Sequence, residues 1–119
     1  MTLILFLQLS IPVVILSVWL FRANKKTTFR GGNSDTLKEE FKFYGLSSSI
    51  FYIIGFIKIA LSIILFASIW NEILLLYSSL GLAMLMLGAT IFHLKSRDSI
   101  KKTSPSFVLF ILNLFMAVN

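Results

Sequence analysis

The chain has 119 residues, of which 57% are hydrophobic and only 13% are charged, and its mean hydropathy is +0.90. This composition is too apolar for an ordinary soluble domain, while the length suits one domain. The chain has no cysteine, which excludes disulfides and thiolate metal sites, and its formal net charge of +6 comes from basic residues placed between apolar runs. Membrane topology explains that placement, so we expect no nucleic-acid partner.

Residues 2–21 form an apolar run without a charge, long enough to cross a hydrocarbon core of about 30 Å. The run lacks the basic start and the small-residue cleavage site of a secretory signal peptide, so we expect it to be retained as the first membrane helix. Pro12 lies near its middle and predicts a kink, because proline removes one backbone hydrogen bond. Gln8 and Ser10 are its polar positions.

The one long polar segment, residues 22–48, is expected to form a cytoplasmic loop that contains a short amphipathic helix. Gly-Gly-Asn at residues 31–33 predicts a flexible turn. Thr36 followed by Glu39 indicates a capping box at the start of the helix, and Gly45 suits the C′ position at its end. We expect this helix to lie in the membrane interface, and the open alternative is a plain re-entry segment into the next helix.

Three further apolar runs follow. They predict helices at residues 49–70, 73–94 and 105–118. The first two are separated by a minimal turn, and a second basic loop at residues 95–104 precedes the last helix. Ser104 and Pro105 predict the start of that helix, with serine as the N-cap and proline in the first turn. The last helix is short for a full crossing of the membrane.

The basic residues orient this predicted bundle. Six lie between the first and second helices, four lie between the third and fourth, and the turn between the second and third has none. Because Lys and Arg accumulate in cytoplasmic loops, both basic loops are expected in the cytoplasm and both termini outside. We therefore predict an all-α integral membrane protein, a four-helix bundle in the cell membrane, and expect that membrane to be a bacterial inner membrane.

Small residues recur on two of the predicted helices. Gly55 and Ser62 are seven residues apart on the second, and Gly81 and Gly88 have the same spacing on the third. Small side chains let membrane helices approach closely. We expect these two stripes to face each other.

Lys58 lies roughly 13 Å from the start of the second predicted helix. A lysine at a helix centre costs about 2.5 to 3.5 kcal/mol on insertion scales, so we expect it to face the bundle interior. Asn113 falls at the same depth, with Gln8 and Ser10 nearby, which predicts a hydrogen bond between Lys58 and Asn113. Two interpretations stay open: a polar cluster that fixes helix packing, or a cation that awaits a quinone carbonyl or a lipid phosphate.

His93 and Asp98 lie at the end of the third helix and in the loop after it, where we expect interfacial polar residues. His93 is the only histidine, so a haem held by two histidines is excluded. We expect no metal site and no catalytic residue, and no cofactor is evident from the residues themselves.

Two segments carry a family resemblance, residues 43–65 and 84–107. Their shared features are Gly45-Leu46, the glycine before Lys58, the MLGA sequence at residues 86–89, His93, Asp98, Lys101-Lys102 and Pro105. With these features the chain resembles the DoxX-like family of small four-helix membrane proteins. Many members of the wider family carry a glutamate near the position of Lys58. The resemblance implies kinship with a small subunit of a thiosulfate:quinone oxidoreductase, and hence a quinone as a ligand.

On these grounds we expect a non-catalytic accessory or scaffold subunit of a membrane complex, with a quinone-linked redox complex implied by the resemblance. Its partners would be membrane lipids and either other membrane subunits or further copies of the chain. The alternative is a small four-helix transporter, or a membrane protein that binds a lipid or small molecule. Small multidrug exporters of this length need a glutamate in the first helix, and the first helix here has no charge.

Overall fold

The computed structural model describes residues 2–24, 30–32 and 34–118, and this part of the chain contains helices and no strands. Asn33 of the predicted turn lies outside the described residues. The helical elements in chain order are α1 (Thr2–Leu16), η1 (Ser17–Phe21), α2 (Leu37–Phe43), α3 (Ser48–Ala67), η2 (Ser68–Trp70), α4 (Glu72–Lys95) and α5 (Ile100–Val118).

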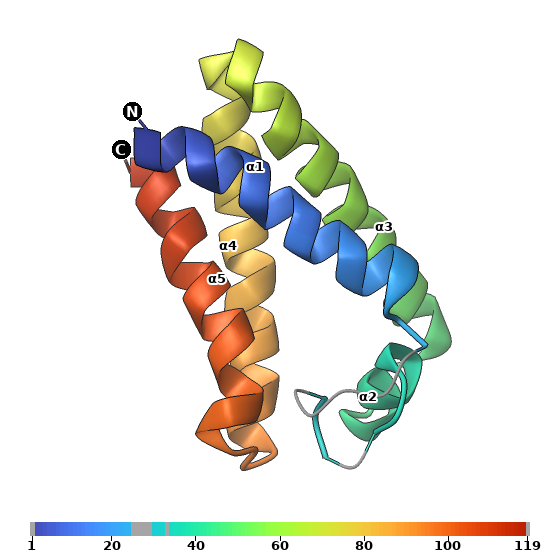
Figure 1. Cartoon of the computed structure of the whole chain (residues 1–119). Coiled ribbons are helices and arrows are strands. Elements are labelled where there is room, and N and C mark those ends of the chain that lie inside the picture. The colour runs from blue at the N-terminus through green and yellow to red at the C-terminus, as the bar shows by residue number, and fades with distance from the viewer. Residues whose placement is uncertain (1, 25–29, 33, 119) are drawn as a thin grey trace.

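The start of α1 and the end of α5 lie together at one end of the molecule, and α2 lies at the other (Figure 1). α5 runs antiparallel to α4 and packs along it, α3 packs against α4, and α1 packs mainly against α3. We call the end that holds residues 22–24, 30–32, 34–47 and 96–99 the loop end, and the opposite one the terminal end. The two basic segments therefore meet at one end of the bundle.

Within the described residues, three helical segments are long and apolar enough to cross a membrane. They are Leu3–Phe21, Ser48–Trp70 and Glu72–Lys95. Their inner faces form the core with the inner face of α5, through Leu7, Ile11, Ile15, Leu65, Leu82, Met86 and Met116. Large apolar side chains such as Phe56, which is 74% exposed, cover the outer faces. α5 is not among the three candidate spans.

α1 continues through Pro12 and ends in an irregular turn. Residues 17–21 form a π-helix, in which the Arg22 N–H donates to the Ser17 carbonyl at 2.8 Å. The Ser17 hydroxyl donates to the Val14 carbonyl at 2.8 Å. Single π turns inside helices often occur at functional sites, and this one carries Trp19 at the inner side of the loop end.

The predicted capping signals of α2 are confirmed. Thr36 Oγ1 accepts a hydrogen bond from the Glu39 N–H at 3.1 Å. Gly45 has φ +81°, its N–H donates to the Lys42 carbonyl, and the Leu46 N–H donates to the Phe41 carbonyl. This is a Schellman motif, which ends the helix and turns the chain toward α3.

The predicted start of the last helix is wrong. α5 begins at Ile100, capped by Ser99, whose hydroxyl accepts from the Lys102 N–H at 3.3 Å. Pro105 therefore lies inside the helix and cannot donate to the Lys101 carbonyl. The Ser104 hydroxyl donates to that carbonyl at 3.1 Å instead, so the helix passes through the proline with this acceptor satisfied.

The predicted contact between two stripes of small residues is only partly present. A Cβ added to Gly55 would lie 2.5 Å from the Trp19 ring, so this glycine faces η1 and not α4. A Cβ on Gly81 would lie 2.9 Å from Leu61, so Gly81 does approach α3, whereas nothing lies within 4 Å of that position at Gly88. The prediction is therefore wrong for Gly55, where the Trp19 ring occupies the space over α3, and for Gly88, which meets no neighbour.

Candidate functional site

The turn after α4 places Asp98 against His93. Arg97 adopts the left-handed conformation with φ +57°, and the Asp98 N–H donates to the His93 carbonyl at 3.0 Å. This second Schellman motif folds the chain back over the last turn of α4. The Asp98 carboxylate thereby reaches the imidazole, with 2.8 Å between Oδ2 and His93 Nδ1.

Tyr44 joins this pair from the C-terminal end of α2. Its hydroxyl donates to Asp98 Oδ2 at 3.0 Å and lies 2.9 Å from His93 Nδ1. Because an ionised carboxylate only accepts, His93 Nδ1–H donates to Asp98. The other ring nitrogen, Nε2, is then directed to Glu40 Oε2 at 3.6 Å. We call Glu40, Tyr44, His93 and Asp98 the polar cluster.

Backbone groups of residues 31 and 32 complete the cluster. The Gly31 N–H donates to Glu40 Oε2 at 2.7 Å, and the Gly32 N–H donates to Asp98 Oδ1 at 3.1 Å. Lys102 donates to the Gly32 carbonyl from α5. A Cβ on Gly31 would lie 2.1 Å from Tyr44 Oη, so the loop approaches this closely only because the residue is glycine.

The cluster shifts the pKa of two of its members outside the apolar spans. Burial raises the pKa of Asp98, but the hydrogen bonds from Gly32, His93 and Tyr44 outweigh burial and hold that pKa below its usual value. Burial, followed by the negative charge of Glu40, raises the pKa of Tyr44 well above its usual value. Asp98 is therefore an ionised acceptor and Tyr44 a neutral donor.

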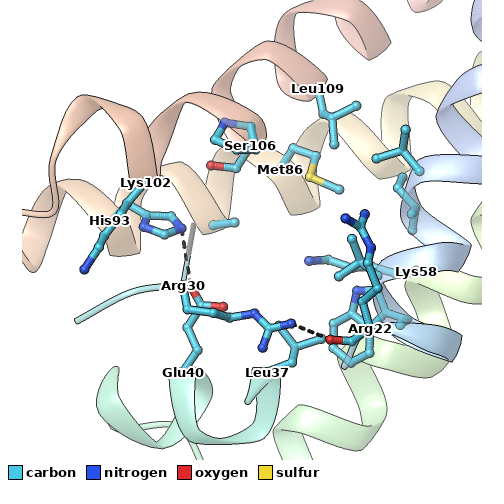
Figure 2. Close-up of a pocket in the computed structure, with 16 residues that line it drawn as sticks. Arg22, Arg30, Leu37, Glu40, Lys58, Met86, His93, Lys102, Ser106 and Leu109 are labelled. Carbon is cyan, nitrogen blue, oxygen red and sulfur yellow. Dashed lines mark hydrogen bonds and ion pairs between the residues drawn. The ribbon is translucent and has the colours of Figure 1, made fainter. Parts of the chain in front are cut away.

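A cavity of about 310 Å³ lies beside the cluster, between α1 with η1 on one side and α4 with α5 on the other (Figure 2). Its ionisable lining residues are Arg22, Arg30, Glu40, Lys58, His93 and Lys102. Its apolar walls include Val14, Val18, Met86 and Leu109. Figure 2 shows Lys58 and Arg22 on one side of the cavity, with His93 and Lys102 on the opposite side. The cavity thus combines apolar walls with several hydrogen-bond donors.

Lys58 is 9% exposed and lines this cavity. Its Nζ lies 5.4 Å from the centre of the Trp19 ring, a cation–π contact. No hydrogen bond joins the ammonium to an acceptor among the described residues, and Glu40 is the one carboxylate that lines the same cavity. The buried position fits the expectation that Lys58 faces the interior.

The predicted hydrogen bond between Lys58 and Asn113 is absent. Asn113 is fully buried, but its Nδ2 donates to the Leu109 carbonyl at 2.8 Å within α5. Gln8 donates to the Ser68 hydroxyl at 2.9 Å, so its amide serves the terminal end. The half-buried Ser10 does not join Lys58 either. Matching depths from sequence spacing failed because α5 begins five residues earlier than predicted, so Asn113 lies five residues farther from the start of its helix than was counted.

The sequence did not single out Glu40, Tyr44 or Arg30. Arg30 is 5% exposed, and its guanidinium donates to the Arg22 carbonyl at 2.8 Å, which fastens the polar segment to the end of η1. A signal was present, since two adjacent glycines, of which Gly31 is nine residues before Glu40, precede a capped helix that carries this carboxylate. Only the folded loop shows that the Gly31 N–H binds that carboxylate and that the Gly32 N–H binds Asp98 instead.

The described residues contain no group of three or more metal-binding side chains. A carboxylate, an imidazole and a phenol in contact can relay or hold a proton, and the basic side chains beside them can bind an anionic or carbonyl oxygen. The arrangement is therefore suited to binding a polar headgroup at the end of an apolar bundle.

A comparison with known families matches the DoxX-like family over residues 11–116, which confirms the resemblance carried by the sequence. No curated protein and no solved structure matches the chain. The matched range includes both sides of the cavity and the whole polar cluster.

Proposed function

Since the chain belongs to the DoxX-like family and three of its helical segments can cross a membrane, it is a membrane protein, and we propose that it is a non-catalytic accessory subunit that holds an amphiphilic ligand inside a membrane complex. A quinone-linked redox complex is the setting that we propose from the family. The ligand would occupy the cavity at the loop end.

Lys58 is the observation that supports this proposal. Its ammonium faces the cavity without a hydrogen-bond acceptor from the described residues, and a ligand in the cavity can supply one. The cavity volume of about 310 Å³ lies at the lower end of the range for small-molecule sites. Its apolar walls suit the hydrophobic part of an amphiphile, and its donors suit the polar part.

We further propose how the chain sits in the membrane. All four long helices lie in the membrane, α2 rests in the interface, and the loop end faces the cytoplasm of a bacterial cell with both termini outside. The shared location of the two basic segments at the loop end supports this orientation, because Lys and Arg favour the cytoplasmic side. α5 extends beyond its apolar part by one basic turn, which carries Lys101 and Lys102.

The test is purification of the tagged protein at native expression level in mild detergent, followed by mass spectrometry of copurifying proteins, lipids and quinones. We expect a membrane subunit in stoichiometric amount together with a bound amphiphile. The Lys58→Leu variant should lose the amphiphile and keep the partner subunit. Lys95→Leu is the matched control, since it removes the same charge from an exposed position of α4.

Two results would contradict the proposal. A chain that purifies without any stoichiometric partner is not an accessory subunit. An amphiphile that remains bound in Lys58→Leu at the wild-type level does not occupy the cavity.

A further inference from the structure

The charge around the cavity is unbalanced. Four basic side chains, Arg22, Arg30, Lys58 and Lys102, line it together with one carboxylate, Glu40. Glu40 already accepts hydrogen bonds from Gly31 and lies against His93. A neutral ligand would leave this excess of positive charge in place, whereas an anion would offset it.

Each basic side chain keeps donors for a ligand. Arg30 donates to the carbonyls of Arg22 and Ala23 through its two terminal nitrogens, and Arg22 donates to the Ser17 hydroxyl at 3.0 Å. A guanidinium has five N–H donors, so both arginines retain some. Their fork geometry matches phosphate oxygens, which accept several donors at once.

Lys58 supplies the second, independent observation. It is more than nine-tenths buried, and its ammonium has no hydrogen-bond acceptor among the described residues, yet it lines the same cavity as the two arginines (Figure 2). Its own contact is the Trp19 ring, which lies on the inner side of the cavity. An ammonium so placed lacks only an acceptor from outside the chain.

The cavity also reaches the outer surface of α1. Val14 lines it and is 42% exposed, whereas the adjacent Ile15 is 3% exposed and belongs to the core. A chain attached to a headgroup can therefore leave along the apolar face of α1, past Val14 and Val18. This is the face that lipid tails would cover if α1 crosses the membrane.

We propose that the cavity binds the phosphate group of an amphiphile, with the phosphate oxygens held by Lys58, Arg22 and Arg30 and the apolar chain directed out along α1. The inference rests on the proposed ligand-binding function and specifies the ligand as an anionic phosphate rather than a neutral quinone. A lipid headgroup and a free phosphate share this chemistry.

The test uses the full chain in dodecyl maltoside micelles with Trp70→Phe as background, which leaves Trp19 as the only tryptophan. Trp19 emission is followed during titration with dodecyl phosphate, inorganic phosphate or decylubiquinone. We expect saturable binding of dodecyl phosphate that weakens as salt is raised. Lys58→Met and Arg22→Gln should each weaken it at least tenfold, while Lys95→Met should leave it unchanged.

Arg22→Gln tests the site even if Lys58→Met fails to fold, because Arg22 is exposed and its replacement does not disturb the core. Displacement of dodecyl phosphate by inorganic phosphate at similar concentration would support a site for free phosphate. A far weaker inorganic competitor would support a lipid headgroup.

Saturation by decylubiquinone without saturation by dodecyl phosphate would overturn this inference and leave the accessory-subunit function standing. Phosphate binding by a chain that purifies without a partner would support this inference and contradict the accessory-subunit function. Equal affinity in wild type, Lys58→Met and Arg22→Gln would place the phosphate outside the cavity and also overturn the inference.

Discussion

The middle of the bundle and its loop end satisfy polar groups in opposite ways. Away from the loop end, most buried hydroxyl and amide donors bond within their own helix, as when Ser78 donates to the Leu74 carbonyl at 2.7 Å and Ser79 to the Leu75 carbonyl. At the loop end, the partners are far apart in sequence, as with Tyr44 and Asp98. The middle is thus held by packing, and the loop end by hydrogen bonds between segments.

The largest effect is expected from removing the carboxylate at the centre of the cluster. Asp98→Ala leaves the donors of Tyr44, His93 and Gly32 without an acceptor, so we expect a loss of about 3 kcal/mol in unfolding free energy. Thermal unfolding in detergent measures it. Glu72→Ala removes an exposed carboxylate at the other end and should cost little. Equal losses in both variants would show that the loop end is not specially dependent on these bonds.

Gly31→Ala tests the close approach of the loop to Tyr44. The new Cβ would lie 2.1 Å from the Tyr44 hydroxyl, so we expect a loss of about 2 kcal/mol from overpacking. Gly88→Ala is the matched control in the middle of the bundle, because nothing lies within 4 Å of its added Cβ. Limited proteolysis of the loop should accelerate in the first variant only. Unchanged cleavage would contradict the contact.

Acid should loosen the loop end before the middle. The pKa of Asp98 is held below its usual value of 3.8 in the folded chain, so its contribution to stability is complete above that value. It is lost as the pH falls through the lower, folded pKa. The unfolding temperature at pH 6 and pH 3 should therefore differ more in wild type than in Asp98→Asn. An equal difference in both would assign acid sensitivity to other groups.

Arg97→Gly should stabilise the turn between α4 and α5 slightly. A side chain at φ +57° costs about 1–2 kcal/mol, and glycine removes that cost but gains freedom in the unfolded chain. We expect a net gain of about 0.5 kcal/mol in unfolding free energy. Arg97→Ala keeps the strained backbone and should bring no gain, so equal unfolding temperatures for the two variants would refute this account.

The smallest effect belongs to the middle of the bundle. Ser62 Oγ is buried without a hydrogen-bond partner among the described residues, so Ser62→Ala should change stability by less than about 0.5 kcal/mol. Ser68→Ala should cost about 1 kcal/mol, because its hydroxyl accepts from Gln8 and donates to Leu65. Equal costs at both positions would mean that Ser62 has a partner after all.

The long apolar runs of the sequence predicted the long helices, because a membrane-length apolar run is a local feature that can be recognised without knowing the tertiary contacts. The capping signals of α2 were equally local and were correct. The start of α5 was not predictable in the same way, since Pro105 and Ser104 resemble a helix start until Ser104 is seen to bond the Lys101 carbonyl. This one side-chain hydrogen bond distinguishes a helix that passes through Pro105 from a helix that starts there.

The site was less accessible to prediction. Lys58 was recognisable because a charge in an apolar run is costly wherever it lies. Its expected hydrogen bond to Asn113 was not found, because the depth of Asn113 was counted from a helix start five residues too late. The polar cluster depends on bonds such as that between Gly32 and Asp98, 66 residues apart, which no spacing rule anticipates.

The connection between α3 and α4 consists of η2 and Asn71, whose side chain accepts from the Ile73 N–H and caps α4. α3 and α4 therefore form a tightly connected helical hairpin. α1 and α5, which pack mainly against different members of that hairpin, have no such constraint between them. Because the cavity lies between α1 and α5, a bound ligand would bridge two helices that are otherwise joined mainly through this hairpin.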